Sequence, residues 1–459
     1  MKNRSSKVAA GAAGVIAVAM ACAMAPAQAA PAPISPPPAA TFAAFAFPDA
    51  ATGSSTLLTG IRTNGSSNTS QVFMSGVYKT SAGTQGLLYE GALSGGGDWT
   101  LLNRPSTAGA TTSSTALYGP DNIGTTGINV VGSYKTTQTG KLDHGVILSA
   151  PNGVGGAKTW TTLDATSLVT TGAHAWKAPA FNNTITLGSQ GATVAAVQKA
   201  LVARGFEIPG LGTSTAPLGT FGSGSKAALL AYQQANPGNG SANGQVNGSL
   251  YAALTTDSLK NTIAHSNRGG LVVGNFDTRL IEGRAFVTTT TGSKWFEITK
   301  PGAVSITAYG IWQNSTNNYT IAGGYFTPDT GQSPVEHGYL VTYNPSTQTL
   351  SNWASYDFQN RPAAVRVTHF DGITPDGNGG YNLTGDWLGV GAGSKGLGFF
   401  AHVPTRSNGT FGTATWVQLK NPGSAITSGN SVYENYAIGV YVNSGSSIVY
   451  PYLATILVP

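Results

Sequence analysis

Few ionisable side chains of this chain stand where they could do chemistry, and the two most suitable are His265 and Asp371. Each follows a short apolar segment and is itself followed by a small residue, Ser266 or Gly372. Imidazole and carboxylate groups commonly act as general base and general acid, so His265 and Asp371 are the candidate catalytic residues. His369 lies two residues before Asp371, would point to the same side of a strand, and would deepen the polar site.

A polar residue before Gly or Ser recurs at six places along the chain. These positions are Thr59, Tyr118, His265, Tyr309, Asp371 and Asn430. Buried polar groups need hydrogen-bond partners or water, so six equivalent polar residues predict a hydrated channel. We expect them, together with His369, to bind a ligand, with the two tyrosines orienting a sugar ring or another polar polymer. The simpler interpretation is that this polar ring only lines a water-filled channel.

Other polar residues have structural interpretations. His144 and His337 occupy the same repeat position, each just before a Gly, which predicts a structural hydrogen bond. Residues 376–380, Asp-Gly-Asn-Gly-Gly, are first of all a hairpin turn. Asp371 has no obvious carboxylate partner, because we do not expect Asp386 of the same repeat to reach it.

Known catalytic motifs are missing from the sequence. It has no Gly-x-Ser-x-Gly elbow, no His-Glu-x-x-His and no phosphate-binding loop. His265, His369 and Asp371 lack the local spacing of a metal-binding motif. We therefore predict no metal and no cofactor, and the sequence leaves open whether the protein is an enzyme.

A repeated unit of four β-strands is expected to position these residues. Lys, Arg, Asp and Glu make up 9% of the 459 residues, against about 25% in an ordinary soluble domain, which disfavours long amphipathic helices. The second strand of each unit reads Gly-x-aromatic, and five units have a fourth strand that opens with Trp. The Gly and aromatic residues are Gly76 and Tyr78, Gly132 and Tyr134, Gly274 and Phe276, Gly323 and Tyr325, Gly385 and Trp387, and Gly439 and Tyr441. The tryptophans are Trp99, Trp160, Trp295, Trp353 and Trp416.

The sixth outer strand is expected at the N-terminal end. Trp99, Trp295 and Trp416 are each followed six residues later by Pro, and Phe42 stands at the same distance from Pro48. The segment around Phe42 would thus complete the last unit. Together these features predict a mainly β chain that forms a six-bladed β-propeller closed by its N-terminal strand. A β-sandwich or an open array of sheets is the alternative.

Residues 176–257 have a different character and predict an inserted helical module. Apolar Val194, Val197 and Leu201 have helical spacing, and further helices are expected at about 225–234 and 249–254. The segment at about 185–254 resembles the peptidoglycan-binding-like domain, a module of three helices. The matching residues are Leu187, Gly188, Gly191, Val194, Gln198 and Leu201, then Gly219 to Gly222, Tyr232 and Gln233, and Gly244 to Gly248. Leu218 departs from the Asp usual in that family. The resemblance implies cell-wall binding, or service as a structural spacer.

The first 29 residues predict a cleavable export signal. Lys2, Arg4 and Lys7 precede a small apolar stretch and the motif Ala27-Gln28-Ala29. The single cysteine, Cys22, lies inside this segment, so the mature chain would have no disulfide. Removing three cations lowers the formal charge from +6 to about +3. No later stretch is apolar enough to span a membrane.

The expected organisation is a signal peptide (1–29), two propeller segments (30–175 and 258–459) and the inserted module (176–257). We predict a secreted or periplasmic, cell-wall-associated binding protein. The module would bind peptidoglycan or another envelope glycan, and the propeller would be a platform for a ligand or a protein partner. No clustered stripe of Lys and Arg points to nucleic acid. One alternative is a hydrolase or lyase that acts on a polysaccharide at the channel mouth. A structural or adhesive surface protein is the other.

Overall fold

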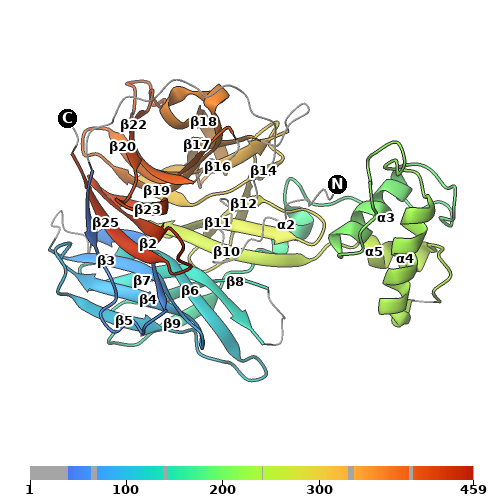
Figure 1. Ribbon diagram of the computed structural model, residues 1–459, viewed down its shortest axis with the longest axis horizontal. Coiled ribbons are helices and arrows are strands. Elements are labelled where there is room, and N and C mark those ends of the chain that lie inside the picture. Colours follow the sequence, from blue (N-terminus) through green and yellow to red (C-terminus); the bar gives the residue numbers. More distant parts are fainter. Residues whose placement is uncertain are drawn as a thin grey trace. The chain divides into compact units, whose positions relative to one another are not determined.

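The computed structural model describes residues 40–63, 70–137, 142–239, 241–328, 335–391 and 396–457. The predicted signal segment 1–29, with Cys22, lies outside these residues. The described chain is mainly β, as predicted (Figure 1). It divides into two compact units. Unit 1 comprises the described residues up to Asp164, Asn261–Phe276 and those from Gly283 onward. Unit 2 comprises Ala165–Lys260 and Asp277–Glu282, and so extends beyond the predicted 176–257 on both sides.

In the part of the chain that the structure describes, the strands of unit 1 form four sheets. The two largest sheets each consist of two antiparallel groups joined by one parallel pair of residues, so there are six successive groups. The first two groups contain β2 (Ser55–Thr63), β3 (Val72–Thr80), β4 (Gly83–Gly91) and β5 (Asp98–Leu102), then β6 (Thr112–Ile123), β7 (Gly127–Thr136), β8 (His144–Ala150) and β9 (Thr159–Thr162). The next two contain β10 (Leu259–Arg268), β11 (Leu271–Thr278), β12 (Arg284–Thr289) and β13 (Trp295–Ile298), then β14 (Ser305–Ile306), β15 (Gly310–Ser315), β16 (Asn318–Thr327), β17 (Val335–Asn344) and β18 (Thr349–Tyr356). The last two contain β19 (Val365–Pro375), β20 (Gly380–Gly389), β21 (Leu397–Pro404) and β22 (Thr415–Leu419), then β23 (Ser424–Tyr433), β24 (Tyr436–Asn443), β25 (Tyr450–Ile456) and β1 (Ala40–Ala44).

The N-terminal strand β1 pairs with β25, which confirms the predicted position of the segment around Phe42. The pairing is antiparallel, with Phe42 opposite Ala454. The ring of Phe42 packs edge-on against Tyr452, with 5.2 Å between centroids. Two strands from opposite ends of the sequence therefore share one sheet.

Replacing Phe42 with alanine tests how much this closing strand contributes. The side chain is only partly buried, so we expect the free energy of unfolding to fall by about 1–2 kcal/mol, less than the about 3–5 kcal/mol of a fully buried Phe. Chemical denaturation measures the change. Thr41→Ala, at an exposed position of the same strand, is the control, and an equal loss in both variants would contradict a packing role for Phe42.

The Gly of each Gly-x-aromatic motif is required by a close approach of the first strand. A Cβ atom at any of the six would lie 2.2 Å or less from a first-strand carbonyl oxygen. These glycines are Gly76, Gly132, Gly274, Gly323, Gly385 and Gly439. In every case the carbonyl belongs to the residue two before a position of the predicted polar ring.

First strands carry β-bulges at the same level. The pairing register shifts across Thr59, Tyr118, Asp371 and Asn430, and Tyr309 lies in the gap between β14 and β15. A bulge places an extra residue on one strand and re-aims its side chain. Bulges thus release Thr59, Tyr118, Asp371 and Asn430 from regular pairing.

First strands of successive groups also contact one another. The contacts are Thr59 Oγ1 to the Leu117 carbonyl (2.7 Å), Asn267 Nδ2 to the Gly119 carbonyl (2.8 Å), the stacked rings of His265 and Tyr309 (3.7 Å between centroids), Thr307 Oγ1 to His369 Nε2 (2.6 Å), and Asn430 Nδ2 to the Leu58 carbonyl (2.6 Å). In addition, β19 packs against β23. The succession of contacts therefore returns from the last group to the first.

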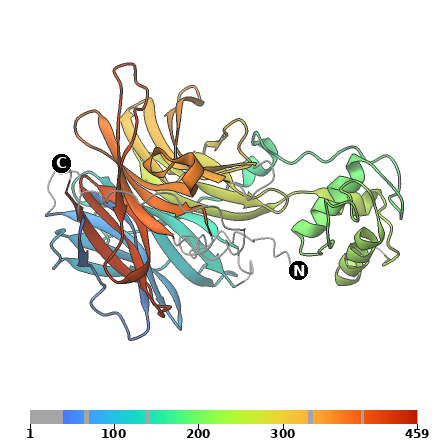
Figure 2. The same ribbon diagram turned by 45° about the horizontal axis from the view of Figure 1, so that its top comes forward.

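Unit 2 contains helices at the three predicted places, in green in Figure 2. After a short α2 (Thr166–Thr171) come α3 (Ala192–Ala203), α4 (Ser223–Ala235) and α5 (Gly248–Thr255). Val194, Val197 and Leu201 lie in its buried core, as their spacing predicts.

Two motif glutamines hold the loops of unit 2 to its helices. The fully buried Gln198 accepts from Gly219 N (2.7 Å) and donates to the Thr220 carbonyl (2.9 Å). Gln233 accepts from Gly244 N (2.9 Å) and donates to the Gln245 carbonyl (3.1 Å). Both side chains are therefore used inside the unit.

None of the helices in the described ranges is long and apolar enough to cross a membrane.

Candidate functional site

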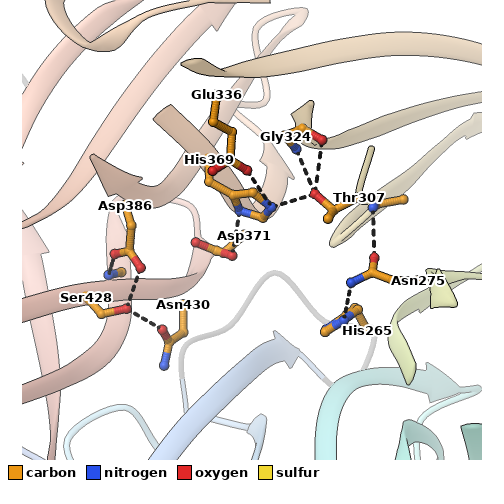
Figure 3. Close-up of polar contacts among 12 residues, drawn as sticks. His265, Asn275, Thr307, Gly324, Glu336, His369, Asp371, Asp386, Ser428 and Asn430 are labelled. Carbon is orange, nitrogen blue, oxygen red and sulfur yellow. Dashed lines mark hydrogen bonds and ion pairs between the residues drawn. The ribbon is translucent and has the colours of Figure 1, made fainter. Parts of the chain in front are cut away.

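The predicted polar residues of β10 and β19, with Tyr309 between them, lie against one another in unit 1. The ring of Tyr309 stacks on the ring of His265. It also meets the ring of His369 edge-on, with 4.5 Å between the centroids of Tyr309 and His369. The ring of Tyr118 also contacts His265, tilted, with 5.2 Å between centroids. Tyr118, His265, Tyr309 and His369 thus form one continuous series of ring contacts. Figure 3 shows the polar contacts of the two histidines.

His369 is the centre of the polar contacts. Its Nδ1 lies 3.0 Å from Asp371 Oδ1, and its Nε2 lies 2.6 Å from Thr307 Oγ1 and 3.8 Å from Glu336 Oε1 (Figure 3). The Thr307 hydroxyl donates to the Gly324 carbonyl and accepts from Gly324 N. Its remaining lone pair can accept from Nε2–H, so both ring nitrogens of His369 have acceptors, as a protonated imidazole requires.

The carboxyl groups around His369 favour its protonated form against the effect of burial. Burial alone would lower the pKa of His369, but the charge and hydrogen bond of Asp371, with Glu336 and Asp386, raise it to about 9. Burial raises the pKa of Asp371, and His369 opposes that rise. The second oxygen of Asp371, Oδ2, is buried and has no hydrogen-bond partner among the described residues.

Glu336 and Asp386 are site residues that the sequence analysis missed. Burial raises the pKa of Glu336 to about 7, although His369 lowers it in part. Burial and the nearby charge of Asp371 raise the pKa of Asp386 well above its ordinary value. Asp386 accepts from Ser428 Oγ (2.9 Å) and Gly429 N (3.1 Å). Asp386 lies opposite His369 in the pairing of β19 with β20, and the charge of Asp371 acts on it, so both carboxyl groups belong to one cluster.

His265 has a different electrostatic state from His369. Asn275 Nδ2 donates to His265 Nε2 (3.2 Å), and Asn275 Oδ1 accepts from Ala308 N (3.2 Å). Burial and the positive charge of His369 lower the pKa of His265 to about 3. His265 is therefore neutral at ordinary pH, and the carboxylate of Asp371 pairs with His369 instead.

Thr59 and Asn430 use their polar groups to join first strands. Thr59 Oγ1 donates to the Leu117 carbonyl, and Asn430 Nδ2 donates to the Leu58 carbonyl. Asn430 Oδ1 also lies 2.9 Å from Ser428 Oγ, which contacts Asp386 as well and shares its one proton between the two acceptors (Figure 3). These two predicted ligand-binding residues are satisfied within the fold, whereas Asp371 retains a free acceptor.

Sequence signals for the missed residues exist. The residue between Gly and the aromatic in each second strand is Val77, Ser133, Asn275, Gly324, Asp386 or Val440. Asn275 and Asp386 from this set meet the site directly. Gly324 leaves space for it, because a Cβ there would lie 2.4 Å from both Glu336 Oε1 and His369 Cδ2.

Glu336 has a repeat counterpart in Asp143, since each precedes a His and a Gly. Asp143 accepts from Lys135 Nζ (2.6 Å) and Ser133 Oγ (3.2 Å). The position that corresponds to Lys135 is Phe326, so Glu336 turns to His369 of the next group. The same repeat position is thus a paired acid in one group and a site residue in another.

The remaining motif predictions are confirmed. His144 Nδ1 bonds to Asp164 Oδ2 and His337 Nδ1 to Asp357 Oδ1, both at 2.8 Å, so these histidines have the same structural hydrogen bond. Residues 376–380 form the turn between β19 and β20, where Asp376 Oδ1 accepts from Asn378 N and Gly380 N.

The arrangement can exchange protons and accept hydrogen bonds. A cationic imidazole, a carboxylate with a free oxygen and two carboxyl groups of raised pKa lie in one buried cluster, which is typical of functional sites but occurs also in structural networks. Within the described ranges, no group of three or more His, Cys, Asp or Glu residues is arranged to hold a metal ion.

Comparisons with known proteins give distant likenesses. No protein-family model and no curated protein matches the chain. A xylan β-1,4-xylosidase from Bacillus halodurans C-125 is similar with a TM-score of 0.28 and 8% identity, over 83% of this chain and 63% of that one. The core factor of S. cerevisiae is similar with a TM-score of 0.30 and 8% identity, over 92% and 62%. The chain spans less than two thirds of the length of either, and these likenesses support no conclusion about its function.

Proposed function

We propose that this is an exported, cell-wall-associated binding protein. Unit 2 is a peptidoglycan-binding-like module that binds peptidoglycan or another envelope glycan. Unit 1 is a six-bladed β-propeller, closed by β1, that serves as a platform for a ligand or a partner. Its polar cluster around His369 belongs to the central channel.

The propeller proposal is supported by the repeating groups and their contacts. Four-strand antiparallel groups recur through the described part of unit 1, and contacts between their first strands return to the starting group. The pairing of β1 with β25 supplies the outer strand of the last group. A propeller is the all-β architecture built by such radial repetition.

The binding proposal depends on one observation in unit 2. The motif glutamines are used internally, yet two large apolar side chains, Leu187 and Leu218, are 59% and 46% exposed. They flank the segments joined by hydrogen bonds from Gly188 N to the Phe221 carbonyl and from Gly191 N to the Gly219 carbonyl. Exposed apolar residues beside rigidly held backbone suit contact with the apolar faces of sugar rings. Leu218, the departure from the family pattern, thus lies on the proposed binding face.

A sedimentation assay with purified peptidoglycan tests this proposal. In the full-length chain, Leu187→Ser with Leu218→Ser should raise the dissociation constant at least tenfold, because both contacts with the glycan are lost. The matched control is Leu101→Ser with Val304→Ser, which replaces apolar residues of unit 1 that are 41% and 56% exposed. Equal binding by the two double variants would refute the module as the wall-binding element.

A further inference from the structure

A second layer of side chains lies three residues beyond the polar ring along the first strands. Its members are Arg62, Asp121, Arg268, Trp312, Thr374 and Tyr433. All of them except Asp121 line a cavity of about 820 Å³ in unit 1. The turn at residues 376–380 forms another part of the wall. This volume is within the usual range for small-molecule sites, about 300–1,000 Å³.

Arg62 is a buried cation without a carboxylate partner. Its residue is 5% exposed, and among the described residues its one hydrogen bond goes to the Ile61 carbonyl (2.9 Å). Its Nε is buried with no partner in the same part of the chain. Burial and the charge of Arg268 lower the pKa of Arg62 to about 10, so it remains charged at neutral pH. A buried guanidinium normally has an anion beside it.

The charge of Asp121 raises the pKa of Arg62 in part, but the Asp121 carboxylate is paired with Arg268. Arg268 Nη1 lies 2.6 Å from Asp121 Oδ1 and 3.0 Å from Asn122 Oδ1. Both guanidinium groups lie over the Trp312 ring, at 4.4 Å for Arg268 and 5.5 Å for Arg62. Trp312 and Arg268 thus hold each other in place in the cavity wall. Of the two arginines, Arg62 is the one whose charge remains available to a ligand.

The rest of the wall favours a hydroxyl-rich ligand. It presents amide, hydroxyl and imidazole groups from Asn122, Asn378, Asn382, Thr374, Thr405 and His402. Two carboxylates, Asp376 and Glu434, also line the cavity and can accept from ligand hydroxyls. Few apolar residues are present to hold the side chains of a peptide.

We propose that this cavity binds an acidic oligosaccharide, with a uronate carboxylate on Arg62 and the sugar hydroxyls on the surrounding amides and carboxylates. This site lies in unit 1 and is separate from the glycan-binding face proposed for unit 2. Arg62 and a uronate carboxylate form a charge-assisted pair that can be bidentate. The planar fork of Arg suits this geometry better than the point charge of Lys.

Titration calorimetry on the full-length protein tests the inference with trigalacturonate as the probe. We expect measurable binding of trigalacturonate, and at least tenfold weaker binding of its methyl ester, which has the same rings without the charge. Arg62→Gln should weaken trigalacturonate binding at least tenfold. Arg361→Gln, at an exposed arginine outside the cavity, should leave it unchanged.

A stability measurement separates ligand binding from a structural role. Because Arg62 has no carboxylate partner, Arg62→Gln should keep the thermal unfolding midpoint or raise it. A lowered midpoint with unchanged trigalacturonate affinity would overturn the proposal. The proposal would also be overturned if the methyl ester bound as tightly as trigalacturonate, or if the dipeptide Ala-Ala bound and trigalacturonate did not. The peptidoglycan assay with the Leu187 and Leu218 variants is independent of these results.

Discussion

Replacing Gly385 with alanine is expected to destabilise unit 1 by about 3 kcal/mol or more, at or above the upper end of the range for overpacking substitutions. A Cβ at this position would lie 1.8 Å from the His369 carbonyl oxygen, and the ring of Phe399 would lie 3.0 Å away. Neither the paired backbone nor a fully buried ring can move aside easily. Urea denaturation would show the loss as a lower midpoint.

The control for this substitution is Gly155→Ala. A Cβ added at Gly155 would have no heavy atom within 4 Å, and the residue needs no positive φ. Its replacement should change the midpoint little. If Gly385→Ala and Gly155→Ala had the same stability, the close approach between the first and second strands would not be the reason for the Gly in the repeat.

Stability is expected to fall by about 3 kcal/mol as the pH rises from about 6.5 to about 9, because of His369. The pKa of His369 is raised from 6.5 to about 9 in the fold. The folded state therefore holds the proton more tightly, and its stabilising effect is complete below pH 6.5 and lost as pH passes 9. Denaturation midpoints at a series of pH values would measure this.

His369→Gln should reduce the fall in stability between pH 7 and 9. Glu336, whose pKa is raised to about 7, also makes stability fall with rising pH, but mainly below pH 7. Asp386, whose pKa is raised well above its ordinary value, acts in the same direction, so the share of His369 is the part of the slope that His369→Gln removes. His402→Gln is the control, since His402 lies on β21 and bonds to Asn382 (3.1 Å) outside the cluster. An unchanged slope in His369→Gln would show that His369 is not protonated in the fold.

The β content and the order of the strands could be predicted because their signals recur. Gly-x-aromatic and a fourth-strand Trp repeat in every group or nearly so, and the single displaced copy at Phe42 located β1. The expectation that Trp353 opens its strand is wrong, because β18 begins at Thr349. The Gly signal is strong because steric exclusion by a carbonyl allows no other residue. No single motif encodes the closure of the groups into a propeller, which we propose from the contacts between groups.

The site was predictable only in part, because side chains from different strands and groups complete it. The recurrence of a polar residue before Gly or Ser revealed His265 and Asp371. Glu336 comes from a third strand, and its repeat counterpart Asp143 looks equivalent in sequence while being neutralised by Lys135. The difference depends on which residue of the neighbouring group faces each acid.

The layer that contains Arg62 was missed for a geometric reason. In a regular strand, residues three apart point to opposite faces. A bulge places two residues opposite one and shifts this alternation by one position. Thr59 and Arg62 can then reach the same interior, although a strict period of two would assign them to opposite sides.

The pairing of β1 with β25 has a consequence for how unit 1 folds. The two partners are more than 400 residues apart in sequence, so the sheet that they share cannot form on the ribosome until nearly all of the chain has been made. Contacts of such high sequence separation make folding slow. Unit 2, whose main segment is continuous, is expected to acquire its structure first. A partly made chain would then carry a folded module beside β-strands that still lack their closing partner.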